Sequence, residues 1–129
     1  MKKLIAVIAI STFLLTACGG SGAKVSNLNA AEFATKIADS SVTLVDVRTP
    51  AEFASGHISG ATNIDFESGH FEADINALDK AKTYAVYCRS GNRSGQATAQ
   101  MVKAGFASVF NLNGGVIDWV NSGQLLVTE

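Results

Sequence analysis

The sequence is poor in cysteine, net charge and long apolar runs, and each shortage excludes a class of protein. Two Cys among 129 residues are too few for a small domain held together by disulfide bonds. A formal net charge of −1 and a hydrophobic fraction of 47% exclude a chain that is disordered throughout. No apolar run reaches the ~20 residues of a membrane-spanning helix, which excludes a polytopic membrane protein. What remains is a globular chain whose length suits one domain.

The first 17 residues have the three parts of a secretory signal peptide. Lys2 and Lys3 make a basic start, residues 4–15 form an apolar run, and Ala17 is a small residue at the end. A first core helix or a short membrane anchor is the alternative. It fits less well, because the run is too short to span a bilayer and no polar face interrupts it. We therefore expect residues 1–17 to be cleaved off.

Residues 15–18 (Leu-Thr-Ala-Cys) resemble the lipobox of bacterial lipoproteins. The resemblance implies cleavage after Ala17 and lipid modification of Cys18, palmitate included, which would anchor the protein to a membrane in the periplasm. More than one acyl chain gives stable attachment. Gly19, where Asp would signal inner-membrane retention, favours the outer membrane. Residues 18–23 then form the lipidated Cys and a flexible linker, and residues 24–129 form the folded domain.

Charge and spacing also indicate what the protein does not bind. Without Lys2 and Lys3 the chain has 8 basic and 11 acidic residues, a net charge of −3, and this balance does not favour a nucleic-acid surface. An anionic substrate must then be attracted by local groups. The two His and the one Cys outside the predicted lipid site lack the close spacing of metal ligands, so we expect neither a metal nor a cofactor.

Strand-like and helix-like patterns alternate over residues 24–129, which indicates an α/β fold with a mainly parallel sheet. The β-branched run 42–47 and the run 83–87 have the composition of buried parallel strands, and shorter strands are expected at 24–28, 61–64 and 108–112. Helix start signals stand at Asn29 (with Glu32) and at Thr49-Pro50, and further helices are expected at 66–80, 94–104 and 115–121, followed by a tail at 124–129.

The chemistry-bearing residues follow the strand that ends at Tyr87, in the run Cys88-Arg89-Ser90-Gly91-Asn92-Arg93-Ser94. Sites in such sheets form at the carboxyl ends of strands, so we expect the Cys88 thiol to face solvent there. Gly91 permits a positive φ that turns N–H groups inward, and Ser94 is expected to open a helix whose start favours an anion. Arg89 and Arg93 add positive charge. These features predict a lowered thiol pKa and a nucleophilic thiolate. The alternative is a buried, inert cysteine.

Three segments resemble the signatures of the rhodanese (sulfurtransferase) family, single-domain type. Residues 46–63 follow the pattern D-V-R-x-x-x-E-F-x-x-G-H-I-x-G-A-x-N, residues 88–94 follow C-R-S-G-x-R-S, and Asn113-Gly114-Gly115 with Trp119 follows the closing signature. One departure is Ser59, where many members have Pro. The resemblance spans roughly residues 25–120. It implies one rhodanese-like α/β domain with a mainly parallel sheet flanked by helices on both faces.

The resemblance also implies an activity. Cys88 would accept sulfur from a donor such as thiosulfate as a persulfide, then pass it to a thiol or cyanide acceptor. The loop from Arg89 to Arg93 would surround the persulfide with backbone N–H groups, with Arg93 supporting the loop.

Asp46, Arg48 and His57 match positions of the first signature near or beneath the site. From the residues alone, we expect an ion pair between Arg48 and Glu52, four positions apart, that acts as a brace. His57 is expected to be a hydrogen-bonded structural residue. Asp46 could touch the site or brace a loop, and the sequence leaves both open.

Two other functions use the same thiolate. A sulfur carrier or persulfide-relay module would pass sulfur to a partner with little turnover of small molecules. A Cys-based phosphatase or arsenate reductase resembles C-x5-R, whereas Arg93 stands five positions after Cys88, which is C-x4-R. The smaller ring suits a single sulfur better than a phosphate, and no Asp can be assigned as a general acid.

Overall fold

The computed structural model describes residues 23–129 of the chain. The predicted signal peptide (1–17), the predicted lipidation site Cys18 and all but the last residue of the predicted linker lie outside the described residues. Within residues 23–129, no helix combines the length and the apolar character needed to cross a membrane.

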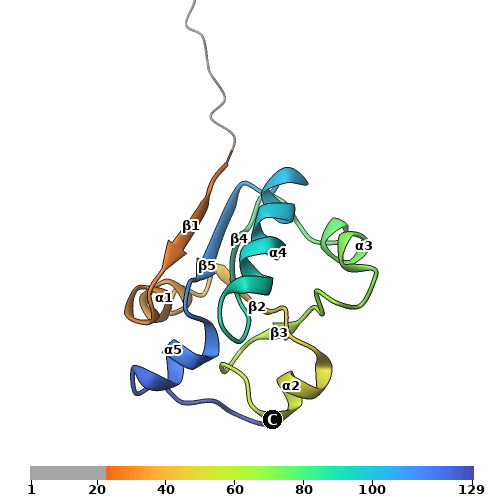
Figure 1. Ribbon diagram of the computed structural model, residues 1–129. Coiled ribbons are helices and arrows are strands. Elements are labelled where there is room, and N and C mark those ends of the chain that lie inside the picture. The colour runs from red at the N-terminus through yellow and green to blue at the C-terminus, as the bar shows by residue number, and fades with distance from the viewer. Residues whose placement is uncertain (1–22) are drawn as a thin grey trace, which may run out of the picture.

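Within residues 23–129, five strands form one parallel sheet in the order β1-β5-β4-β2-β3 (Figure 1). The strands are β1 (Val25–Leu28), β2 (Val42–Asp46), β3 (Thr62–Asn63), β4 (Thr83–Tyr87) and β5 (Ser108–Leu112). The two apolar runs become the inner strands β2 and β4, as predicted, because an inner strand is apolar on both faces. All strands run in the same direction. The chain therefore enters β1 at one end of the sheet, and the loops after β2 and β4 lie at the other end.

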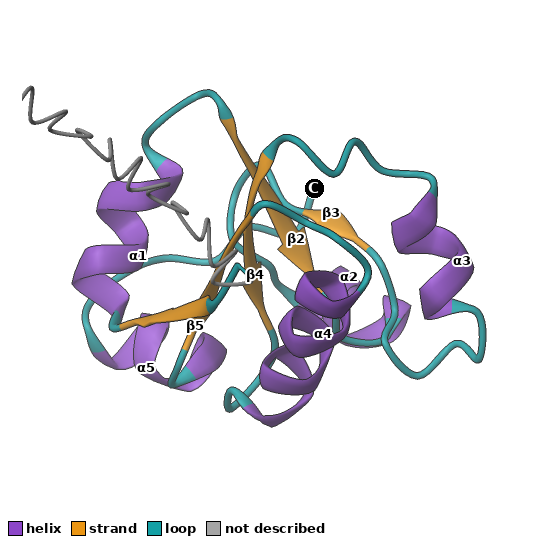
Figure 2. Ribbon diagram, turned by 90° about the horizontal axis from the view of Figure 1, so that it is seen from above, coloured by secondary structure: helices purple, strands orange, loops and turns teal. Residues whose placement is uncertain are grey.

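Helices cover both faces of this sheet, which confirms the predicted α/β class (Figure 2). Two of them, α1 (Ala30–Ile37) and α5 (Gly115–Asn121), pack on one face, and α3 (Phe71–Asn76) and α4 (Asn92–Lys103) pack on the opposite face. The short helix α2 (Pro50–Ser55) buries none of its residues and lies at the carboxyl end of the sheet (Figure 1). Its Glu52 is hydrogen-bonded to Arg93 in the first turn of α4.

The two predicted helix start signals are confirmed. Asn29 and Glu32 form a capping box at the start of α1, in which each side chain accepts the other residue's backbone N–H. The Thr49 side chain caps α2 by accepting the N–H of Glu52 at 3.3 Å, with Pro50 in the first turn. Each cap of this kind stabilises a helix by about 1 kcal/mol. The second cap also fixes the position of Glu52 relative to β2.

Two predicted helix starts are wrong, and in each case a glycine with positive φ stands just before the observed start. The helix expected over 66–80 is confined to Phe71–Asn76, and Gly69, with φ +86°, belongs to the turn before it. The helix expected from Ser94 already begins at Asn92, because Gly91 takes φ +99° at its N-cap. Ser94 therefore lies in the first turn of α4 instead of opening it.

The predicted C-terminal tail is packed against the domain. Val127 and His57 exchange backbone hydrogen bonds of 2.8 Å in an antiparallel bridge. The indole N–H of the buried Trp119 donates to the carbonyl of Leu125 at 3.0 Å. These contacts hold the end of the chain beside the segment between α2 and β3.

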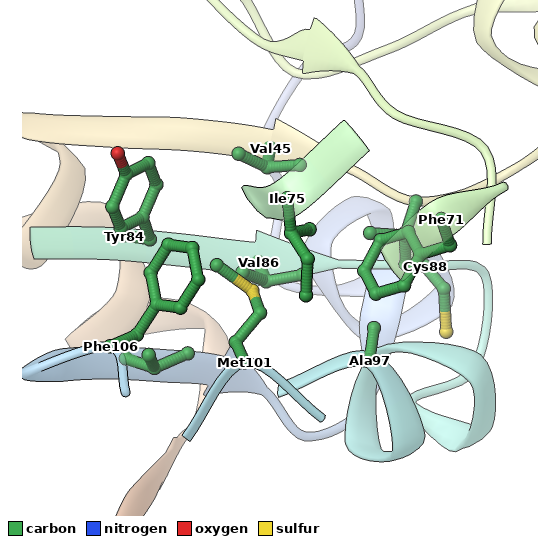
Figure 3. Close-up of a cluster of buried hydrophobic side chains, with 11 residues drawn as sticks. Val45, Phe71, Ile75, Tyr84, Val86, Cys88, Ala97, Met101 and Phe106 are labelled. Atoms are coloured by element: carbon green, nitrogen blue, oxygen red, sulfur yellow. The ribbon is translucent and has the colours of Figure 1, made fainter. Parts of the chain in front are cut away.

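The central strand β4 supplies side chains to both halves of the core. Tyr84 and Val86 point into the cluster covered by α3 and α4, whereas Ala85 and Tyr87 point into the cluster covered by α1 and α5. Cys88 lies on the same side as Tyr84 and Val86 and stands at the end of that line of side chains (Figure 3). Burial of such side chains contributes roughly 1.5–3 kcal/mol each to folding, so the strand that leads to Cys88 is firmly held.

Candidate active site

Cys88 follows β4 directly and lies beneath the loop that leads into α4. In Figure 3 its sulfur points away from the rest of the cluster, toward the ribbon of α4. The residue is a free cysteine with 1% of its surface exposed. The expectation of a solvent-facing thiol is therefore wrong, because the loop folds over the sulfur. The residue is buried, but its sulfur faces polar donors, which sets it apart from an inert core cysteine.

Those donors come from the loop and from the first turn of α4. The Gly91 N–H donates to Cys88 Sγ at 3.1 Å, and the Ser94 hydroxyl lies 3.3 Å from the same sulfur. Burial on its own raises the pKa of the Cys88 thiol. Hydrogen bonds from the Ser94 hydroxyl and from the backbone N–H groups of Ser94, Gly91 and Ser90 outweigh that effect, so the pKa lies below its ordinary value. The predicted lowering of the pKa thus has its cause in hydrogen-bond donors.

The loop is held in place by the segment that begins α5. The Val116 N–H donates to the carbonyl of Cys88 at 2.9 Å, and the Ile117 N–H donates to the carbonyl of Arg89 at 3.1 Å. Gly115, with φ +61°, lies so close to the Arg89 carbonyl that a Cβ at this position would overlap it. Gly91 is pressed in the same way against the carbonyl of Asn113. The close packing explains why glycines stand at these two points.

Arg93 faces two carboxylates at the rim of the loop. Its guanidinium donates to both oxygens of Glu52, at 3.0 and 2.8 Å, and Glu67 lies 3.5 Å away. The hydrogen bonds to Glu52 are the main cause of a raised Arg93 pKa. The predicted ion pair between Arg48 and Glu52 is wrong, because the Glu52 carboxylate is taken by Arg93. Glu67 is a site neighbour that the sequence did not indicate, since it belongs to none of the three signatures.

Arg48 instead pairs with Asp46, and both are buried. The Asp46 carboxylate accepts from Arg48 Nη2 at 2.6 Å and from the Arg48 backbone N–H at 2.9 Å, and Nη2 also donates to the carbonyl of Gly56 at 2.7 Å. Burial alone lowers the pKa of Arg48, but the hydrogen bonds to Asp46 reverse this and raise it. Of the two roles left open for Asp46, bracing the loop after β2 is the one its contacts describe.

His57 has the contacts of a structural residue, as predicted. It is 4% exposed, and its Nδ1 lies 2.9 Å from the carbonyl oxygen of Phe53. Its ring stacks on the Phe53 ring with centroids 3.8 Å apart. The ring thus fastens the end of α2 to the segment that follows it.

The remaining loop residues, Arg89, Ser90 and Asn92, are exposed. The Asn92 side chain accepts a hydrogen bond from Gln96 at 3.1 Å, one turn further along α4. Within the part of the chain that the structure describes, no three His, Cys, Asp or Glu side chains are grouped as metal ligands would be.

The fold and the site together define a class of protein. It is a small α/β domain with a parallel sheet, in which a loop after the central strand holds a cysteine of lowered pKa under converging N–H and O–H donors. Residues 29–122 match the family model described as "Rhodanese-like domain", and the chain belongs to this family.

Several similar proteins carry sulfurtransferase names. A protein of Allochromatium vinosum named "Sulfurtransferase" is 36% identical over 104 residues, which cover 80% of this chain and 95% of the relative. The thiosulfate sulfurtransferase GlpE of Pseudomonas aeruginosa strain LESB58 is 40% identical over 91 residues, or 70% and 80% of the two chains. The crystal structure of a rhodanese-related protein from Thermoplasma volcanium superposes with a TM-score of 0.72 at 31% identity. The match covers 81% of this chain and 99% of that chain. These similarities support a transferase.

Proposed function

We propose that this protein is a sulfurtransferase that moves a sulfane sulfur from a donor such as thiosulfate to a thiol or cyanide acceptor through a persulfide on Cys88. The observation that carries the proposal is the environment of one atom. Cys88 Sγ accepts hydrogen bonds from the Gly91 N–H and the Ser94 hydroxyl, and its pKa is lowered in spite of burial. Thiosulfate as the donor is taken from the name of the Pseudomonas aeruginosa relative.

In the first step the Cys88 thiolate attacks the outer sulfur of thiosulfate. A bond forms between Sγ and that sulfur, the S–S bond of the donor breaks, and sulfite leaves with the electron pair. In the second step a thiolate or cyanide attacks the terminal sulfur of the persulfide, and Cys88 leaves as a thiolate. This two-step covalent route needs no external oxidant.

The loop stabilises negative charge on sulfur in both steps. Preorganised N–H and O–H groups aimed at a developing anion are the most effective form of such stabilisation in a buried site. Since Glu52 and Glu67 face the Arg93 guanidinium, the amide and hydroxyl donors of the loop have to stabilise most of the charge on Cys88. Arg93 keeps the loop attached to α2.

Mass spectrometry tests the proposal on purified protein. After exposure to thiosulfate and removal of excess reagent, the wild-type protein should gain the mass of one sulfur atom, and Cys88→Ser should gain none. An unchanged wild-type mass would contradict the persulfide route. Steady-state turnover of thiosulfate and cyanide then separates an enzyme from a sulfur-relay module, which would load but turn over slowly. Turnover of an aryl phosphate without persulfide formation would favour a Cys-based phosphatase instead.

We also propose, from the sequence, that the mature protein is lipid-anchored at Cys18 in a bacterial periplasm, with the outer membrane favoured. The signal-peptide pattern of residues 1–17 and the lipobox resemblance of residues 15–18 support this. Labelling of growing cells with palmitate should mark the wild-type protein and leave Cys18→Ser unmarked. Equal labelling of both would contradict the anchor, and separation of the membranes would show which one holds the protein.

A further inference from the structure

A groove of about 340 Å³ adjoins the active-site loop between α2 and α5. Its walls include Glu52 and Ser55 of α2, Arg89 of the loop, Val116 and Ile117 of α5, and Leu126 of the C-terminal segment. The C-terminal segment crosses between α5 and α2 at this end of the molecule (Figure 1). The groove adjoins the active-site loop, because Val116 in its wall is hydrogen-bonded to the Cys88 carbonyl and Arg89 in its wall follows Cys88 in sequence.

The charges of this groove leave one cation available. Arg48, which also lines it, is bound by Asp46, and Glu52 is bound by Arg93. Within residues 23–129, no carboxylate forms a salt bridge with Arg89, and its side chain is exposed. The groove should therefore stabilise a bound anion next to Arg89.

Part of the groove's lining is apolar and accessible. Ile117 is one of the large apolar side chains with substantial exposure, at 45%, and Val116 and Leu126 are half-buried. A volume near 340 Å³ lies at the lower end of the range for small-molecule sites. Cyanide would contact almost none of this wall, whereas an organic thiol with one carboxylate can contact both Arg89 and the apolar side chains.

We propose that this groove binds the sulfur acceptor, and that the acceptor is a small thiol bearing a carboxylate. The carboxylate pairs with Arg89, the carbon chain lies on Val116 and Ile117, and the thiolate reaches the terminal sulfur of the Cys88 persulfide. A new S–S bond forms between acceptor and terminal sulfur, the bond from Sγ to that sulfur breaks, and Cys88 leaves as a thiolate. The inference rests on the proposed function, since it requires the persulfide.

The test measures how fast preformed persulfide is discharged by three thiols that differ in charge: 3-mercaptopropionate, 2-mercaptoethanol and cysteamine. Their intrinsic reactivities cancel when the rate-constant ratio of the anionic to the cationic thiol is compared between protein variants. Arg89→Gln should lower this ratio roughly five- to tenfold, the effect of losing about 1 kcal/mol of charge pairing. Arg89→Lys should keep most of the preference. Lys103→Gln, which removes an exposed cation at the far end of α4, controls for net charge and should keep all of it.

A second variant separates the groove from the loop. Ile117→Asp places a carboxylate on the groove wall and should lower the same ratio, without altering a residue of the loop. An unchanged ratio in Arg89→Gln overturns the inference, and so does a change in Arg89→Gln with none in Ile117→Asp, because Arg89 would then act on the sulfur and not through the groove. If the wild-type protein forms no persulfide, the proposed function itself fails, which is a distinct result.

Discussion

Replacing Ser94 by Ala should raise the pKa of Cys88 and leave the fold intact. Ser94 is fully buried, and its hydroxyl lies 3.3 Å from Cys88 Sγ. A hydrogen bond to a charged group contributes about 1.5–3 kcal/mol. At 1.36 kcal/mol for each pKa unit, loss of this bond should raise the pKa by about one to two units. Because the group is reactive only when deprotonated, the thiolate fraction at any pH below both midpoints should fall by roughly ten- to a hundredfold. The rate should fall by a smaller factor, because a thiolate of higher pKa is a better nucleophile.

The assay is the pH dependence of alkylation of Cys88 by iodoacetamide. The rate should rise with pH through a single ionisation, with a midpoint below that of an ordinary thiol in the wild-type protein and a higher midpoint in Ser94→Ala. Ser90→Ala is the matched control. It is the same substitution in the same loop, and it retains the backbone N–H through which Ser90 acts on the sulfur. Coincident midpoints for wild type and Ser94→Ala would refute the reasoning, since the pKa would then not depend on the hydroxyl.

Two further substitutions test the scaffold around the site. Asp46→Asn leaves the buried Arg48 guanidinium without its carboxylate and should lower the free energy of unfolding by about 3–5 kcal/mol, measured by urea titration; a loss under 1 kcal/mol would contradict a bracing role. Gly115→Ala forces a Cβ against the Arg89 carbonyl at φ +61° and should cost more than about 1 kcal/mol and slow persulfide formation. Gly123→Ala, also at positive φ but in open space, is its control, and equal loading rates in the two variants would contradict the close packing.

Local signals in the sequence predicted most of the fold. The apolar runs that became β2 and β4 carry their own pattern, and the caps at Asn29 and Thr49 depend on residues three positions apart. The apolar pattern of residues 83–87 likewise predicts that Cys88 stands at the carboxyl end of a buried strand. These features could be predicted because each is determined within a few residues.

The ion pairs of the site could not be predicted in this way. Spacing of four residues brings two side chains together only inside a helix, and Arg48 precedes the Thr49 cap of α2. The Arg48 side chain therefore pairs with Asp46, and Glu52 pairs with Arg93, 41 positions further along the chain. Only the parallel pairing of β2 with β4 brings that partner within reach.

Burial of the Cys88 sulfur was missed for a related reason. The loop covers it because the segment from Asn113 to Gly115, more than twenty positions away, presses on the loop backbone from the side of α5. The Gly114-Gly115 pair was visible in the sequence as part of a signature. Nothing in the pair itself shows that Gly115 packs against the carbonyl of Arg89.

The single direction of the strands has a practical consequence for handling the protein. A bead, a sensor chip or a fused reporter joined ahead of Val25 would stand at the end of the molecule away from Cys88, so immobilised material should stay open to reagents in solution. A tag added after Glu129 would stand near His57 and the groove instead, and would compete with whatever approaches the sulfur there.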